Sequence, residues 1–273
     1  MHLSVIGNIS IDTVAYGTRV CKPFYGGAGL NVAIAAARAG CRPRLISVVG
    51  KQSNDLLTRV SPYIDTEYVS IRDGQTCQFG IEYNEDGTLL NLNCDFGVSY
   101  ELTNFLETIP LNEGFYHVCC RNPINPISII ERLQSNSLPF SLDFIASSVS
   151  EQAEYCRHSF GYADIVFVNR QEKIILDTIP ESTEIKLLIV TAASEPVSIF
   201  QRGEQIMEVQ CPVHQRSEVT GAGDVFAGTF LANYLARRSA HASVVHAIAA
   251  AQQSLEEDGV CSDLTAEFID VAN

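Results

Sequence analysis

A short glycine-rich turn followed by a carboxylate is the part of this chain best suited to chemistry. Residues 221–224 read Gly-Ala-Gly-Asp and lead directly into an apolar run at 225–231. Two glycines around an alanine leave space for an anion, and the unpaired N–H groups at a helix start favour phosphate. Asp224, in the first helical turn, is placed to take a proton from a hydroxyl beside that anion. The pattern predicts phosphoryl transfer; the simpler alternative is a core helix in which Asp224 only complements the helix dipole.

A second glycine turn, near the N-terminus, favours the catalytic interpretation. Residues 26–40 form a glycine turn, an alanine-rich helix and a terminal Gly40 that suits a left-handed helix stop. Asn31 is an amide in an otherwise apolar first turn, so it can point at a polar ligand. Asp12 follows the first predicted strand, and a carboxylate there can accept two hydrogen bonds from a polyol. For Asp12 the alternative is a solvated loop residue or a helix cap.

Short apolar runs alternate with helical patterns along the chain. Continuous apolarity indicates strands covered on both faces, and the alternation predicts an α/β fold with a mostly parallel sheet flanked by helices on both faces. The predicted strands are 3–6, 45–49, 115–119, 140–142, 165–168 and 187–190, and the predicted helices are 30–39, 127–134, 149–156, 222–236 and 241–255.

One segment departs from this alternation. Residues 76–83 and 88–93 are strand-like and flank an Asp86-Gly87 turn, which predicts a β-hairpin. We expect one domain over 1–273, with this hairpin around 76–93 as a small excursion at the sheet edge.

The composition limits the possible partners. The chain has 273 residues, 46% of them apolar, and a formal net charge of −14. Such a chain can bury a sizeable core, and its acidity argues against nucleic acid or an anionic membrane as a partner. A bound nucleotide would therefore need backbone amides, helix ends and Mg²⁺ to compensate its charge.

Cysteine usage and the N-terminus indicate a cytoplasmic location. The nine cysteines are irregularly spaced and form no Cys-x-x-Cys pair, so reduced thiols are expected. The N-terminus has no basic leader, and no apolar stretch approaches the roughly 18 residues that span a bilayer.

Taken together, the motifs resemble those of the ribokinase-like, or phosphofructokinase-B type, carbohydrate kinase family. The two glycine turns are similar to the family's paired signatures. Residues 7–12 resemble its Gly-x-x-x-x-Asp substrate element, and residues 169–172 its Asn-x-x-Glu element. The matches follow the family order over nearly the whole chain.

This resemblance implies roles for individual residues. It implies that Asp224 is the catalytic base, and that Gly221, Ala222 and Gly223 form the anion hole. Glu172 would hold Mg²⁺ through water. The implied substrate contacts are Ser10, Asp12, Gly26, Gly27 and Asn31, and the implied nucleotide contacts are Asn169, Thr191, Ala193 and Thr220. The hairpin would be a β lid, through which the family often forms homodimers; Phe79, Ile81 and Leu90 could supply the apolar face.

The chain also departs from the family pattern. Ala193 and Pro196 replace two glycines of the usual Thr-x-Gly-x-x-Gly loop beside the nucleotide. Glu218 stands where an aspartate usually adjoins a monovalent-cation site, which leaves potassium activation open. Ala28 replaces the lysine of true ribokinases, which counts against ribose itself.

The expected function is Mg²⁺-assisted transfer of the γ-phosphoryl group of ATP to a hydroxyl of a sugar or sugar derivative. Two alternatives remain: a nucleoside kinase of the same family, and a ligand-binding pseudokinase without turnover. A nicotinamide-dependent dehydrogenase is disfavoured, because residues 7–10 lack the Gly-x-Gly-x-x-Gly turn.

Overall fold

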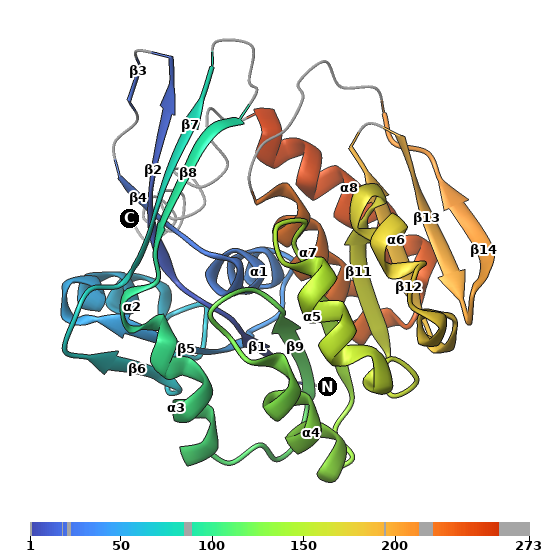
Figure 1. The fold of residues 1–273 in the computed structure, drawn as a ribbon, viewed down its shortest axis with the longest axis horizontal. Coiled ribbons are helices and arrows are strands. Elements are labelled where there is room, and N and C mark those ends of the chain that lie inside the picture. Colours follow the sequence, from blue (N-terminus) through green and yellow to red (C-terminus); the bar gives the residue numbers. More distant parts are fainter. Residues whose placement is uncertain are drawn as a thin grey trace.

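A nine-stranded sheet forms the centre of the molecule (Figure 1). The computed structural model describes residues 2–17, 19–20, 23–84, 89–193, 195–212 and 221–256. Within this part of the chain the strand order is β14-β13-β12-β11-β10-β9-β1-β5-β6, and all neighbours from β6 to β12 are parallel. The strands are β1 (Leu3–Ile6), β5 (Arg44–Gly50), β6 (Val69–Arg72), β9 (Phe115–Cys119), β10 (Phe140–Asp143), β11 (Ile165–Asn169), β12 (Leu188–Ala192), β13 (Glu195–Gln201) and β14 (Glu204–Val209).

Helices cover both faces of this sheet, as the continuous apolar strands predicted. One core packs the sheet against α1 (Ala28–Arg38), α2 (Asn54–Val60), α7 (Ala222–Arg237) and α8 (Ala240–Glu256). The other packs it against α3 (Leu102–Thr108), α4 (Pro126–Ser135), α5 (Val149–Cys156) and α6 (Arg170–Leu176). Short 3-10 helices occupy Lys51–Ser53, Gly97–Glu101, Arg157–Ser159 and Pro180–Glu184.

Two helices far apart in the sequence, α1 and α7, lie against each other because Gly228 lacks a side chain. A Cβ atom on Gly228 would overlap the carbonyl oxygen of Val32 in α1. This close approach brings the N-terminal turn of α1 next to that of α7, so the two predicted glycine turns meet.

The predicted lid is larger than the predicted hairpin, which is a correction to the sequence analysis; its closure over a substrate stays a prediction. It is a five-stranded sheet built from β2 (Ser10–Tyr16), β3 (Arg19–Val20), β4 (Phe24–Gly26), β7 (Cys77–Tyr83) and β8 (Leu89–Asp95). The expected pairing of β7 with β8 is present, but β7 also pairs in parallel with β2. The predicted Asp86-Gly87 turn lies outside the described residues.

The lid strands bury only a few apolar side chains. Val14, Ile81 and Tyr83 form a small cluster of their own, whereas Leu90 is 63% exposed. The homodimer through the lid stays a prediction.

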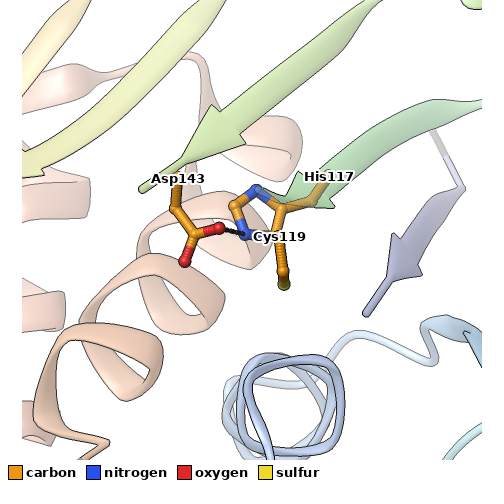
Figure 2. Close-up of side chains that lie close together, drawn as sticks. All are labelled: His117, Cys119 and Asp143. Carbon is orange, nitrogen blue, oxygen red and sulfur yellow. Dashed lines mark ion pairs between the residues drawn. The ribbon is translucent and has the colours of Figure 1, made fainter. Parts of the chain in front are cut away.

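Polar side chains gather where β9 and β10 end. In their parallel register His117 pairs with Ser141, and Cys119 pairs with Asp143. His117, Cys119 and Asp143 therefore approach one another in the interior (Figure 2). In the described part of the chain, no helix has the length and apolarity needed to cross a membrane.

Candidate active site

The N-terminus of α7 is an uncapped helix start with room in front of it. Gly221 adopts a left-handed conformation, with φ of 98°, and among the described residues no side chain caps the helix. A Cβ atom placed on Gly223 would meet no atom of the described chain within 4 Å. The first N–H groups of a helix have no intrahelical acceptor, so they are available to an anion. Thr220 and Glu218 lie outside the described residues.

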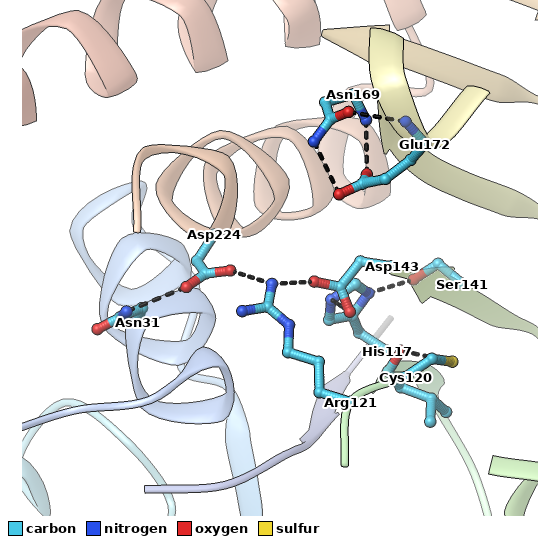
Figure 3. A network of polar contacts seen from close by, with 10 residues as sticks. Asn31, His117, Cys120, Arg121, Ser141, Asp143, Asn169, Glu172 and Asp224 are labelled. Atoms are coloured by element: carbon cyan, nitrogen blue, oxygen red, sulfur yellow. Dashed lines mark hydrogen bonds and ion pairs between the residues drawn. The ribbon is translucent and has the colours of Figure 1, made fainter. Parts of the chain in front are cut away.

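Asp224 follows this turn and is held by two donors from other elements (Figure 3). It is only 4% exposed. Asn31 Nδ2 donates to Asp224 Oδ2 over 3.0 Å, and Arg121 Nη2 lies 2.6 Å from Asp224 Oδ1. Asn31, expected to point at a substrate, thus orients the predicted base; its contact with substrate stays a prediction.

Arg121 is the main functional residue that sequence reasoning missed. Its Nη2 also donates to Asp143 Oδ2 over 2.8 Å, so the guanidinium bridges two buried carboxylates. Burial would lower the pKa of Arg121, but Asp224 and Asp143 outweigh burial and raise that pKa above its ordinary value. Arg121 Nε has no hydrogen-bond partner among the described residues. One sequence signal could have identified Arg121: it directly follows a predicted buried strand, and ligands bind at the carboxyl edge of a parallel sheet.

Asp12 lies in lid strand β2, rather than in a loop beyond the central sheet. It is 5% exposed, and its Oδ1 has no hydrogen-bond partner within the described ranges. Burial raises the pKa of Asp12 to about 6; the Ser10 hydroxyl opposes this rise and the Asp224 carboxylate adds to it. Gly26 pairs with Ser10 across β4 and β2, and a Cβ on Gly26 would collide with the Asp12 carboxylate. A buried carboxylate with an unused oxygen is suited to accept hydrogen bonds from a polar ligand.

The pH dependence of activity should follow the ionisation of the Asp12 carboxyl group. If the ionised carboxylate binds the acceptor hydroxyls, kcat/KM is expected to fall about tenfold per pH unit below about pH 6. Asp12→Asn should lower kcat/KM at neutral pH and remove this limb. Initial rates from pH 4.5 to 8 test the assignment, with Asp73→Asn as control because the Asp73 side chain is 89% exposed. A limb near pH 6 that persists in Asp12→Asn contradicts it.

The free energy of unfolding should fall as pH rises, whereas kcat/KM should rise. The folded-state pKa values of Asp12 and Glu172 are raised to about 6 and about 7, so the folded protein binds more protons than the unfolded chain below these values. The stabilising contribution of both groups is full at low pH and is lost as pH rises through about 6 and about 7.

Two glycines at the start of α1 permit close backbone approach. Gly27 has φ of 94° and precedes the helix, and a Cβ on it would lie 2.6 Å from the Asn8 carbonyl oxygen. Gly29 lies against the backbone of Gly7, which is a packing role. The substrate contacts predicted for Ser10, Gly26 and Gly27 remain predictions.

Asn169 and Glu172 form a capping box at the start of α6. Glu172 accepts hydrogen bonds from the Asn169 backbone N–H and from Asn169 Nδ2, both at 2.7 Å. Burial raises the pKa of Glu172 to about 7, partly opposed by the Asn169 backbone hydrogen bond. Since Asn169 engages both oxygens, the box fits contact with Mg²⁺ through water better than direct ligation. That role is still a prediction.

Thr191 and Ala193 lie where β12 ends. The Thr191 hydroxyl donates to the Val168 carbonyl over 3.5 Å, and Ala193 has φ of 48°. Ala193 therefore occupies a left-handed conformation that favours glycine, although the residue is not glycine. Their contact with nucleotide remains untested.

Ala193→Gly is expected to stabilise the protein modestly. The left-handed conformation costs an L-residue about 1–2 kcal/mol, of which the greater freedom of glycine in the unfolded chain cancels about 0.4–1 kcal/mol. The melting temperature should rise by about 2 °C. Thermal denaturation, with Ala192→Gly in the adjacent strand as a destabilising control, measures this. A lower melting temperature for Ala193→Gly contradicts the strain argument.

The fold and this constellation define a phosphotransferase of the ribokinase-like class. The model of the pfkB family of carbohydrate kinases matches residues 3–267, so the chain belongs to that family. A cytidine kinase of Thermococcus kodakarensis is 27% identical over 255 residues, which cover 86% of this chain and 88% of that protein.

Solved structures share the fold. The nucleoside kinase of Burkholderia thailandensis in complex with inosine superposes with a TM-score of 0.83 at 18% identity, covering 97% of each chain. Ribokinase from Cryptococcus neoformans var. grubii serotype A in complex with ADP has a TM-score of 0.75 at 17% identity, covering 97% of this chain and 99% of that one.

These findings confirm the predicted family and the predicted α/β fold with a large, mostly parallel sheet. The chain is a ribokinase-family kinase. A free sugar as acceptor is not confirmed, because the similar proteins include a cytidine kinase and a nucleoside kinase, as in the alternative kept above.

Proposed function

We propose that this protein transfers the γ-phosphoryl group of ATP to a hydroxyl on the sugar moiety of a nucleoside. The observation that carries the proposal is the chain of contacts Asn31–Asp224–Arg121–Asp143 beside the uncapped start of α7. With Asp224 as the base and the α7 turn as the anion site, these contacts would join both to the cation of Arg121, and these are the parts that phosphoryl transfer needs.

Asp224 accepts the proton of the attacking hydroxyl. Asn31 and Arg121 each engage one of its oxygens, which leaves a second lone pair on each oxygen for the substrate. Because both donors come from other elements, the carboxylate is oriented before substrate arrives. Preorganised orientation of this kind lowers the barrier without a rearrangement during reaction.

Arg121 and the α7 turn stabilise the transferred group. The guanidinium keeps its charge beside Asp224, and its Nε remains available as a donor. The N–H groups of Gly221, Ala222 and Gly223, the predicted anion hole, would meet the same developing charge. Removing an arginine from this role in phosphoryl transfer costs about 10³–10⁵ in kcat in other enzymes.

Asp12 selects the acceptor from the lid side. A ribose ring offers neighbouring hydroxyls, and the unused Asp12 Oδ1 can accept a hydrogen bond from one of them. The sequence of the cytidine kinase, similar over 86% of this chain, supports a nucleoside as the molecule that carries this ring. A free sugar presents the same hydroxyls, so the acceptor must be separated by experiment.

The nucleotide lies on the other side of the α7 turn. We place Asn169, Thr191 and Ala193 beside ATP, with Glu172 contacting Mg²⁺ through water; Thr220 would adjoin the phosphates. Mg²⁺ supplies charge neutralisation between the phosphates when it is bound. The structure of a ribokinase with ADP supports ATP as the phosphate donor.

The deciding experiment measures ADP release with Mg-ATP across cytidine, other nucleosides, ribose, hexoses and amino sugars. We expect the highest kcat/KM with a nucleoside, and phosphorus NMR of the product should show a phosphate ester on its sugar. Turnover with free sugars but with no nucleoside supports the sugar kinase instead. If acceptors bind in a thermal-shift assay but none of them leads to release of ADP from ATP, the result supports the pseudokinase.

A further inference from the structure

A buried cluster next to Asp224 joins Asp143, which holds Arg121, to two residues that the phosphoryl-transfer scheme does not use. It consists of His117, Cys119 and Asp143, whose Nε2 or Nδ1, Sγ and carboxylate oxygen atoms lie within 4.8 Å of one another. His117 and Cys119 are fully buried, and Asp143 is 5% exposed. Figure 2 shows the imidazole edge facing the carboxylate, with the Cys119 side chain beside it.

Two polar atoms in this cluster lack partners. His117 Nε2 and Asp143 Oδ1 face each other at 3.8 Å, and neither has a hydrogen bond among the described residues. This separation is too long for a hydrogen bond. It is close to the roughly 3.3 Å between a nitrogen and an oxygen that ligate one tetrahedral zinc ion. A cation between these two buried atoms would give both of them the partner that they lack among the described residues.

The surroundings of His117 favour the tautomer that binds metal. Its Nδ1 lies 2.9 Å from Ser141 Oγ, and that hydroxyl is 3.5 Å from the Tyr116 carbonyl oxygen. If Ser141 donates to this carbonyl, its oxygen accepts from Nδ1–H, and Nε2 presents a lone pair. Histidine ligands usually donate their other N–H in this way. Asp143 also has an outer partner, because Arg121 holds its second oxygen.

We propose that His117 Nε2, Cys119 Sγ and Asp143 Oδ1 form a binding site for a zinc ion. Nitrogen, thiolate and carboxylate are the donors that Zn²⁺ takes in proteins, and three protein ligands leave one coordination position open. On binding, the S–H bond of Cys119 breaks, the S–Zn bond forms and the proton passes to solvent.

Charge balance supports this site. With a neutral thiol and imidazole, the single positive charge of Arg121 faces the two negative charges of Asp143 and Asp224. The buried group then has one excess negative charge. Zn²⁺ together with loss of the thiol proton adds one net positive charge, so the occupied cluster is neutral. Buried charges are tolerated when they are paired or bound to a metal.

Zinc at this position should slow the kinase. Asp143 would share its charge between the ion and Arg121, which weakens the hold of Asp143 on the guanidinium that contacts Asp224. The site is distinct from that of Mg²⁺, which prefers oxygen ligands.

Cobalt binding to the metal-free, full-length protein tests the site directly. Co²⁺ replaces Zn²⁺ and gives a thiolate-to-metal charge-transfer band. We expect one equivalent to produce this band in the wild type and in Cys120→Ser, which changes the adjacent buried thiol outside the cluster. Cys119→Ser and Cys119→Ala should lose the band, and His117→Gln should weaken Co²⁺ binding about 100-fold or more.

Two further readouts complete the test. In the wild type and in Cys120→Ser, stoichiometric Zn²⁺ should raise the melting temperature and lower the kinase rate. In the two Cys119 variants, Zn²⁺ should change neither quantity. The Cys119→Ala variant keeps the test valid if serine is not tolerated in the apolar surroundings. Absence of the band in wild type, or its persistence in both Cys119 variants, overturns the proposal.

Discussion

Replacing Asp224 by asparagine is expected to lower kcat by about three orders of magnitude. The amide keeps the size of the carboxylate but cannot accept the proton of the attacking hydroxyl, and its NH2 group cannot accept one of the two hydrogen bonds from Asn31 and Arg121. Substrate contacts of Asp12 and the nucleotide side are untouched, so the KM values should stay within about threefold. A coupled assay of ADP release with the best acceptor from the panel measures both constants.

The control for this variant is Asp73→Asn. Asp73 is 89% exposed in its side chain and pairs with Lys51 at the surface, so its loss should leave kcat unchanged. Thermal denaturation of both variants separates a catalytic effect from unfolding. An Asp224→Asn enzyme that keeps more than about a tenth of the wild-type kcat would mean that another group takes the proton.

Replacing Arg121 by glutamine is expected to reduce both activity and stability. Loss of the guanidinium removes the cation beside the transferred group, which should lower kcat by about 10³ or more. It also leaves the buried carboxylates of Asp143 and Asp224 facing each other without compensation. Breaking a buried ion pair from one side costs about 3–5 kcal/mol, so the free energy of unfolding should fall by about this amount. Urea denaturation and steady-state kinetics measure the two effects.

Arg44→Gln is the matched control for this change. Arg44 has a similar exposure, 27% against 21%, and also donates to a carboxylate, that of Asp65 at 3.0 Å. It is the first residue of β5, at the opposite edge of the parallel sheet from the strand ends that carry the site, so its loss should affect stability without lowering kcat. Arg121→Lys keeps the charge without the planar fork and should recover stability more than activity. Equal losses of kcat in the Arg44 and Arg121 variants would contradict a catalytic role for Arg121.

The local patterns of the sequence were sufficient for much of the fold. Runs such as Phe115–Cys119 and Ile165–Asn169 are apolar at nearly every position, and such runs are stable only when both faces are covered. The same locality predicted the helix that starts at residue 222. The lid was underestimated because β2 and β7 pair across more than sixty residues of intervening chain, and no local pattern records such pairing.

The sequence by itself determined which residues form the candidate phosphate turn, because Gly221, Gly223 and Asp224 are defined by their own backbone and by their place in one helical turn. Only the tertiary structure decided what holds Asp224. Asn31 lies 193 residues from it and Arg121 lies 103 residues from it, and parallel strands with crossing helices bring all three together. A side chain's nearest charges in space depend on topology and close helix packing, so an arginine after a strand had no visible partner until the chain was folded.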